Sequence, residues 1–96
     1  MTIHHHADAS GNGSWFVEVN GERLAELGYH VTGAGDYSLD STRVDDRLRG
    51  KNVGKQLVEA AVAFARQNGV KIVPVCPFVV ALFEKVPAYA DVKATS

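Results

Sequence analysis

The sequence predicts a single α+β domain with α/β-like connections, in which an antiparallel β-meander precedes a strand–loop–helix–strand crossover and a short C-terminal helix. Three observations predict it. The first half is rich in β-formers around Asn20-Gly21, the strongest short hairpin signal. Apolar side chains then recur at helical spacing over 53–68. A second apolar stretch, 70–76, is followed by Pro77, which suits the first turn of another helix.

The β-meander is expected to begin with a hairpin. Residues 14–19 contain Trp, Phe and Val, and Asn20-Gly21 predicts a type I′ turn that returns the chain over 22–32. Gly28, inside the returning strand, indicates a bulge or a close backbone approach. A two-residue loop sets the register, and the cross-strand pairs it predicts are Glu18–Arg23 and Val17–Leu24.

The crossover begins with a third strand over 37–44, after a turn at 33–36. The helix over 53–68 has a natural stop at Gly69, because glycine readily adopts the left-handed conformation that ends helices. The strand over 70–76 then returns parallel to the third strand by a right-handed connection. The predicted order is therefore β-β-β-α-β-α.

The C-terminal part follows from its prolines and its apolar composition. Pro74 cannot donate to a ladder, so the last strand should fray or splay from its neighbour there. Residues 78–85 form a short helix that is apolar nearly all round and is expected to be largely buried. Residues 88–92 are expected to form a short strand or an irregular cap.

Composition limits the classes of function. The chain has 96 residues, a net charge of −1 and one cysteine. A nearly neutral protein has no global field to recruit nucleic acid or an anionic membrane. One cysteine excludes an intrachain disulfide, which favours a reducing compartment, so we expect a cytoplasmic protein that is a monomer or a weak homodimer. No segment reaches the length of a transmembrane helix.

The first 13 residues are expected to be a disordered leader, so that the domain spans 14–96. They lack the apolar region of a signal peptide. His4, His5 and His6 could hold a metal loosely, but no second cluster of ligands accompanies them. We therefore expect no metal.

A basic, glycine-containing loop runs directly into the helix, from Arg47 to Lys55. The start of a helix presents unpaired amides and the positive end of the macrodipole, which attract phosphate. The loop is neither a Walker A motif nor a dinucleotide fingerprint, because the spacings of both are absent. Taken alone, it is better explained as a solvated turn with a basic rim.

The rest of the chain strengthens the phosphate interpretation. From about Trp15 onward, the loop, the segment Val73-Pro74-Val75-Cys76-Pro77-Phe78-Val79 and the segment Pro87-Ala88-Tyr89 resemble the short, single-domain GNAT acetyltransferases of the YjdJ type. The resemblance implies a minimal GNAT fold and acetyl-CoA as cosubstrate. The phosphate loop of the family is filled by residues 49–54, with Asn52 where the family has glycine. Asn is the residue that best tolerates the left-handed backbone this requires.

The resemblance also implies a set of site residues. A backbone amide near the end of the third strand, at Val44 or its neighbours, would polarise the thioester carbonyl. The residues expected to bind the cofactor are therefore Val44, Arg49, Gly50, Lys51, Asn52, Val53, Gly54 and Lys55.

Cys76 is the candidate catalytic residue. It precedes Pro77 at a predicted helix N-terminus, where the dipole lowers a thiol pKa. In the similar family a cysteine at this place is suspected of taking the acetyl group, and the alternative is a buried structural cysteine. Ser41 and Val86 occupy positions where the family often has histidine, which removes two candidate general bases.

Other titratable side chains are interpreted more simply. His30, Asp40, Asp45 and Glu84 are expected to be surface charges, and a packing role is at least as good an account of Tyr89 as a catalytic one. The resemblance places Phe83 near the position where many larger GNAT enzymes have a tyrosine that acts as general acid, and phenylalanine cannot donate a proton.

The sequence thus predicts an acetyl-CoA-dependent N-acetyltransferase acting on a small amine or a protein amine. The absent histidines leave a non-catalytic acyl-CoA-binding module as the alternative, and the neutral charge disfavours a nucleic-acid module.

Overall fold

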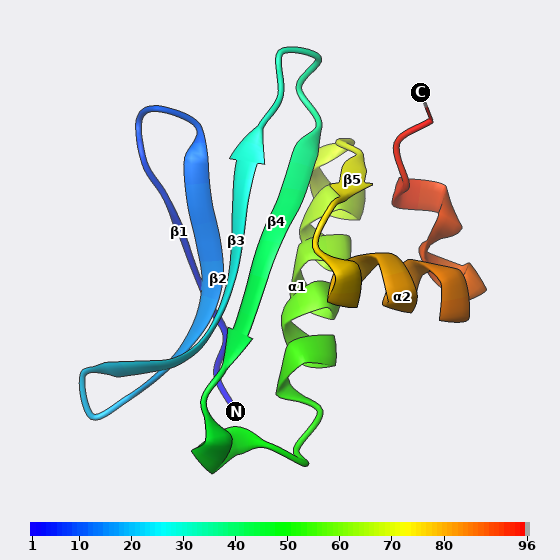
Figure 1. Ribbon diagram of the computed structural model, residues 1–96. Helices are drawn as coiled ribbons and strands as arrows, with labels where there is room; N and C mark the ends of the chain where they lie inside the picture. Colours follow the sequence, from blue (N-terminus) through cyan, green and yellow to red (C-terminus); the bar gives the residue numbers. More distant parts are fainter. Residues whose placement is uncertain (96) are drawn as a thin grey trace.

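The computed structural model describes residues 1–95 and shows one five-stranded sheet with strand order β1-β2-β3-β4-β5 (Figure 1). The first four strands are antiparallel, and β5 is parallel to β4. The strands are β1 (His4–Ala7), β2 (Asn12–Val19), β3 (Glu22–Val31), β4 (Tyr37–Val44) and β5 (Ile72–Pro74). The helices are α1 (Val53–Asn68) and α2 (Pro77–Lys85), with short 3-10 turns η1 (Asp46–Leu48) and η2 (Pro87–Val92). The predicted α+β fold is confirmed.

The N-terminal segment differs from the expected disordered leader over 1–13, because β1 pairs with β2 along its length. Alternation places His5 on the α1 face of the sheet, where its ring stacks on Trp15 with 4.4 Å between centroids. Its Nε2 lies 2.7 Å from the Tyr29 hydroxyl. His4 stacks on Phe16 on the other face, at 5.3 Å. Imidazole rings here pack against aromatic side chains, so a polar composition does not imply a free tail.

The hairpin between β2 and β3 has the predicted turn and one unpredicted bulge. Asn20 and Gly21 both have positive φ, 52° and 80°, as a type I′ turn requires. Glu18 faces Arg23 as predicted, but Val17 faces Ala25 rather than Leu24. The register shift lets the consecutive residues Leu24 and Ala25 both be buried, at 5% and 0% exposure, which strict alternation would prevent.

A second bulge interrupts the pairing of β3 with β4. Gly28 faces Ser41 and Tyr29 faces Leu39, so that Asp40 is the extra residue. A Cβ on Gly28 would lie 3.0 Å from the Ser41 hydroxyl, a tight contact with a side-chain atom. Of the two alternatives predicted at Gly28, a bulge or a close backbone approach, the bulge is confirmed.

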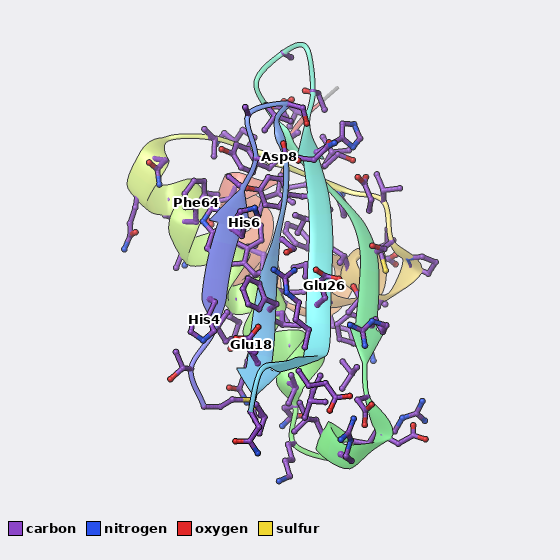
Figure 2. All side chains as sticks on the ribbon, turned by 90° about the vertical axis from the view of Figure 1, so that its left-hand side faces the viewer. His4, His6, Asp8, Glu18, Glu26 and Phe64 are labelled. Atoms are coloured by element: carbon purple, nitrogen blue, oxygen red, sulfur yellow. The ribbon has the colours of Figure 1, made fainter. Side chains whose placement is uncertain are left out.

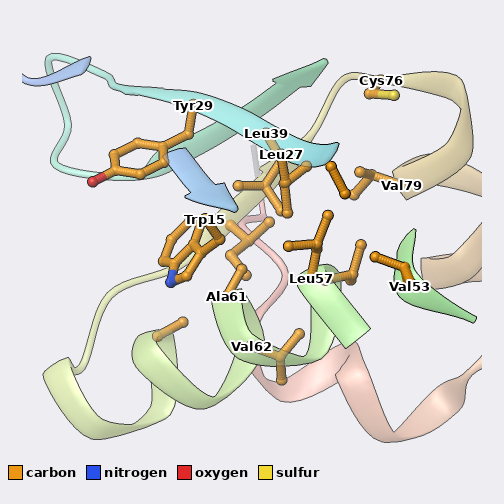
Figure 3. Packing of buried hydrophobic residues seen from close by; sticks show 14 of the residues in the cluster. Trp15, Leu27, Tyr29, Leu39, Val53, Leu57, Ala61, Val62, Cys76 and Val79 are labelled. Carbon is orange, nitrogen blue, oxygen red and sulfur yellow. The ribbon is translucent and has the colours of Figure 1, made fainter. Parts of the chain in front are cut away.

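One face of the sheet packs on α1 to form the core (Figure 3). Leu27 and Leu39 of the sheet and Leu57 of α1 are fully buried. Each such side chain contributes about 1.5–3 kcal/mol relative to an exposed one. The helix has the predicted bounds and ends at Gly69, whose φ is +66°. The opposite face carries polar side chains, among them His4, His6, Glu18 and Glu26 (Figure 2).

The strand β5 is shorter than the expected 70–76 and separates from β4 after Leu39. Pro74, its last residue, faces Leu39, and the amides of Val75 and Cys76 both donate to the Leu39 carbonyl, at 3.2 and 3.0 Å. The predicted splay at Pro74 is therefore confirmed. Beyond this point β4 continues to Val44 without β5 beside it.

The expectation that α2 is largely buried is wrong. Only Val79 is fully buried, and Phe78 is 41% exposed. The helix lies beside the edge of the sheet, where β5 has left, rather than between two layers (Figure 1). The tail forms the irregular cap η2, followed by a single bridge between Lys93 and Ile72. Among residues 1–95 no helix is long and apolar enough to cross a membrane.

The contact of His5 predicts a pH dependence of β1. Burial, followed by the charge of His6, lowers the pKa of His5 below its usual 6.5. A histidine whose pKa is lower when folded stabilises the fold fully above about 6.5, and that contribution is lost as the pH falls. We expect hydrogen-exchange protection factors in β1 to fall between pH 7 and pH 5, and NMR to give a pKa for His5 below the usual 6.5.

The variant His5→Phe keeps an aromatic ring on Trp15 but has nothing to titrate, so the pH dependence of β1 should disappear in it. His4→Gln is the matched control on the other face and should retain the dependence. A His5 that titrates above 6.5 would contradict this assignment.

Candidate functional site

A cavity of about 490 Å³ lies where the end of β4, the following loop, the first turn of α1 and α2 meet. The gap left by β5 opens between these elements. The cavity is lined by Thr42, Val44, Leu48, Arg49, Gly50, Asn52, Val53, Gly54, Lys55, Phe78 and Leu82.

The loop backbone leaves the first amides of α1 without partners in the helix. Gly50 and Asn52 both have positive φ, 81° and 56°, so the left-handed conformation expected of Asn52 is present. Asn52 is the N-cap of α1 but its side chain makes no capping bond, and the first intrahelical bond runs from the Gln56 amide to the Asn52 carbonyl. The amides of residues 53–55 therefore precede the helical ladder, and no acidic residue stands in the first turn.

The basic side chains of the loop divide into two groups. Arg47 donates to both Asp45 and Glu22, at 2.8–3.2 Å, and so points toward the β2–β3 hairpin. Hydrogen bonds from the Arg47 side chain and amide hold the pKa of Asp45 well below its usual value. Arg49 and Lys55 line the cavity instead. Arg49 pairs with Asp46 at 2.7 Å, but both side chains are more than 70% exposed, so that pair is weak.

Part of the cavity wall is apolar, and another part is formed by the end of β4. Leu48, Phe78 and Leu82 supply apolar surface. The Asp45 amide donates to the Leu24 carbonyl, so the amides at 43 and 45 face β3. Strand alternation then turns the amides of Thr42 and Val44 toward the gap left by β5. A carbonyl placed there would meet backbone donors.

Cys76 lies next to this part of β4 without lining the cavity. It is the N-cap of α2, is 8% exposed, and its Sγ is 3.3 Å from Oγ1 of Thr42. Burial raises the pKa of the thiol, but the hydrogen bond with the Thr42 hydroxyl and the nearby amides of Phe78, Val79 and Thr42 outweigh burial and lower the pKa overall. The start of α2 thus stabilises a thiolate.

The cavity brings together most of the residues that the sequence singled out. Cys76 and Lys51 are the exceptions, because neither is part of the lining. The Lys51 carbonyl accepts from the Gln56 side chain at 3.1 Å. The residues that do line it are Val44, Arg49, Gly50, Asn52, Val53, Gly54 and Lys55.

Sequence reasoning missed four lining residues: Thr42, Leu48, Phe78 and Leu82. Two signals could have found three of them. Thr42 stands two residues before Val44 and so shares its side of the strand. Phe78 and Leu82 are spaced i, i+4 and share one helix face.

The remaining candidates lie outside the cavity. His30 and Asp40 pair on the sheet at 2.6 Å between Nδ1 and Oδ2, and Asp40 also accepts from Ser38. Tyr89 is buried and its hydroxyl donates to Glu59 at 3.1 Å, as a packing role requires. Phe83 packs on Tyr89 with 5.3 Å between centroids. Within residues 1–95 there is no group of three or more His, Cys, Asp or Glu side chains arranged to hold a metal ion.

Comparisons with known proteins show which proteins share this fold. The solution structure of a GCN5-like protein from Staphylococcus aureus, named as a proposed N-acetyltransferase, superposes with a TM-score of 0.73 at 30% identity, over 99% of this chain and 89% of that one. The crystal structure of a ribosomal-protein-alanine N-acetyltransferase from Brucella melitensis biovar Abortus 2308 has a TM-score of 0.64 at 18% identity, covers 93% of this chain and 65% of that one, and shows the fold alone. No curated protein matches the chain.

The family model of GCN5-related N-acetyltransferases matches residues 14–92, which include the whole cavity, and the chain therefore belongs to that family of acyltransferases.

Proposed function

We propose that the cavity binds acetyl-CoA and that the protein transfers the acetyl group to an amine. The observation that carries the proposal is the polarity of the cavity. Its lining combines unpaired helix amides, Arg49 and Lys55 with an apolar wall beside the amides of β4. A ligand with an anionic head and a long, thin arm ending in a carbonyl fits both kinds of surface at once.

The chain would divide the work between these two kinds of surface. The loop amides and the first turn of α1 would hold the pyrophosphate, because they supply donors and the positive end of the helix dipole. The Val44 amide would donate to the thioester oxygen as negative charge develops on it during attack. The nitrogen of the amine attacks the carbonyl carbon, the C–S bond breaks, and CoA leaves as a thiolate that takes up the proton released by the amine.

Cys76 would act as an acyl relay in the second version of this reaction. Its thiolate attacks the thioester, forming S-acetyl-Cys76 and releasing the CoA thiolate. The amine then attacks the acetyl-cysteine and regenerates the Cys76 thiolate, with one proton released. The lowered thiol pKa and the contact with Thr42, which lines the cavity, support this version. In the direct version Cys76 only packs beside the cavity.

The acceptor is proposed as a small amine or a protein amine, in a cytoplasmic protein that is a monomer or a weak homodimer. A non-catalytic acyl-CoA-binding module is the second candidate. Ser41 and Val86, where related enzymes often have histidine, favour it, because neither side chain takes up a proton at neutral pH. Neither nucleic acid nor a membrane is proposed as a partner of this nearly neutral chain.

The two groups of basic residues give a matched test of the phosphate site. We expect Arg49→Gln and Lys55→Gln each to weaken CoA binding by roughly tenfold, since a charge-assisted hydrogen bond contributes about 1.5–3 kcal/mol. Arg47→Gln removes the same charge from a side chain bound to Asp45 and Glu22 and should change the affinity less than about twofold. Calorimetric titration with CoA at two salt concentrations measures both. Equal losses in all three variants would show a general field rather than this site.

The loop backbone gives a second test. Asn52→Gly should retain or improve CoA affinity, because glycine adopts the left-handed conformation of residue 52 without strain. Asn52→Val should weaken it at least tenfold, since a β-branched side chain is strongly disfavoured at positive φ. Circular dichroism checks that both variants stay folded. Full affinity in a folded Asn52→Val would remove the loop from the proposed site.

Intact-mass spectrometry separates the two versions of the reaction. If Cys76 is a relay, incubation with acetyl-CoA without acceptor adds one acetyl group, and Cys76→Ala loses turnover while keeping CoA affinity. If Cys76 only packs, no adduct forms and Cys76→Ala loses about 1 kcal/mol of stability with turnover intact. The second pattern would exclude the relay and leave direct transfer.

A further inference from the structure

Phe78 is the large apolar side chain that stands at the meeting of the two helices. It is the second residue of α2 and lines the cavity together with Leu82, one turn later. The ring is 41% exposed, although α2 is otherwise attached through the fully buried Val79. An exposed phenylalanine inside a cavity is apolar surface still available to a ligand.

The ring is seated on the first turn of α1. A Cβ added to Gly54 would lie 2.8 Å from Cζ and 3.0 Å from Cε2 of Phe78, closer than any side chain tolerates. Gly54 is buried and lies within the helix, outside the set of residues with positive φ. Its backbone therefore does not require glycine. The ring of Phe78, in the position it holds here, leaves no room for a side chain at 54, so a larger residue there would displace the ring.

The contact joins the first turn of α1 to the apolar wall of the cavity. Gly54 belongs to the turn whose unpaired amides form the proposed anion site, and Val44 belongs to the strand whose amides face the gap left by β5. A ligand that reaches beyond the loop into the rest of the cavity meets the surface made by Phe78 and Leu82. A ligand that consists of the anionic head alone needs only the loop.

We propose that Phe78, held by its contact with Gly54, is the residue that makes the site select a ligand with a pantetheine-like arm over the bare nucleotide. This inference rests on the proposed function, and it adds a specificity determinant. The ring supplies the apolar wall along which the arm lies. Gly54 is the position that keeps the ring there, because any side chain at 54 displaces it.

The direct test compares CoA with 3′-phospho-ADP, which is CoA without the arm, by calorimetry. In the wild-type chain CoA should bind more tightly than 3′-phospho-ADP. Phe78→Ala should weaken CoA at least tenfold and change 3′-phospho-ADP less than about threefold. Val75→Ala is the matched control, since Val75 is 52% exposed, immediately precedes Cys76 and lies outside the cavity. It should alter neither affinity.

A double-mutant cycle tests the contact between Gly54 and the ring of Phe78. Gly54→Ala alone should weaken CoA roughly as much as Phe78→Ala does, while in the Phe78→Ala background the same change should cost nothing further. Alanine has a higher helix propensity than glycine, so Gly54→Ala should raise the melting temperature in the Phe78→Ala background and raise it less, or lower it, in the wild type. The comparison of melting temperatures can be made without any ligand.

The outcomes distinguish this inference from the proposed function. If the wild-type chain binds neither CoA nor 3′-phospho-ADP, the proposed function fails and the selectivity fails with it. If it binds both, but Phe78→Ala weakens both equally or neither, the role of Phe78 alone is overturned. Additive effects of Gly54→Ala and Phe78→Ala would likewise overturn it.

Discussion

The separation of β5 from β4 at Leu39 is the constraint on which the rest of the structure depends. One carbonyl accepts both the Val75 and the Cys76 amide, and the ladder stops there. Pro74 is the last residue of β5. Beyond this point β4 has one edge without a neighbouring strand, and the amides of Thr42 and Val44 face the gap. Sheets normally protect such an edge, so leaving it open requires a compensating use.

The same separation starts α2 and places the thiol. Cys76 is both the last residue bonded to β4 and the N-cap of α2. Its sulfur therefore lies at the positive end of a helix and next to the open edge of a strand. Donors from two elements converge on it, which explains why the pKa of a buried thiol is lowered rather than raised. Whether or not Cys76 carries the acetyl group, the splay fixes its environment.

The acidic residues around the loop shape its charge. Asp45 and Glu22 engage Arg47 at the end of the hairpin, which leaves Arg49 and Lys55 at the cavity. The Arg49–Asp46 pair is exposed and weak, so Arg49 can exchange its carboxylate partner for a phosphate at little cost. The loop thus concentrates positive charge locally in a chain whose net charge is −1, which suits a small anion better than a polyanion.

The elements that could be predicted from the sequence are those decided by local chemistry. The turn at Asn20-Gly21, the bounds of α1 and the left-handed Asn52 each depend on a few neighbouring residues. The features that were missed depend on distant ones. β1 is stabilised by the contacts of His5 with Trp15 and Tyr29. The bulge at Leu24 accompanies the burial of two consecutive residues, Leu24 and Ala25. Neither partner is visible in a local pattern.

The exposure of α2 is another feature that the local sequence pattern did not predict, and it bears on the candidate site. An apolar helix was expected to be buried, because apolar surface normally leaves water during folding. Here Val79 alone is fully buried, while Phe78 and Leu82 line the cavity from the same helix face. Apolar surface that the fold does not cover can be covered by a ligand, and this is the part of the cavity wall without charged side chains. The apparent failure of the hydrophobic pattern and the apolar wall of the candidate site are therefore one feature of the molecule. The pattern predicted correctly that α2 seeks an apolar partner, but the chain itself supplies only part of that partner.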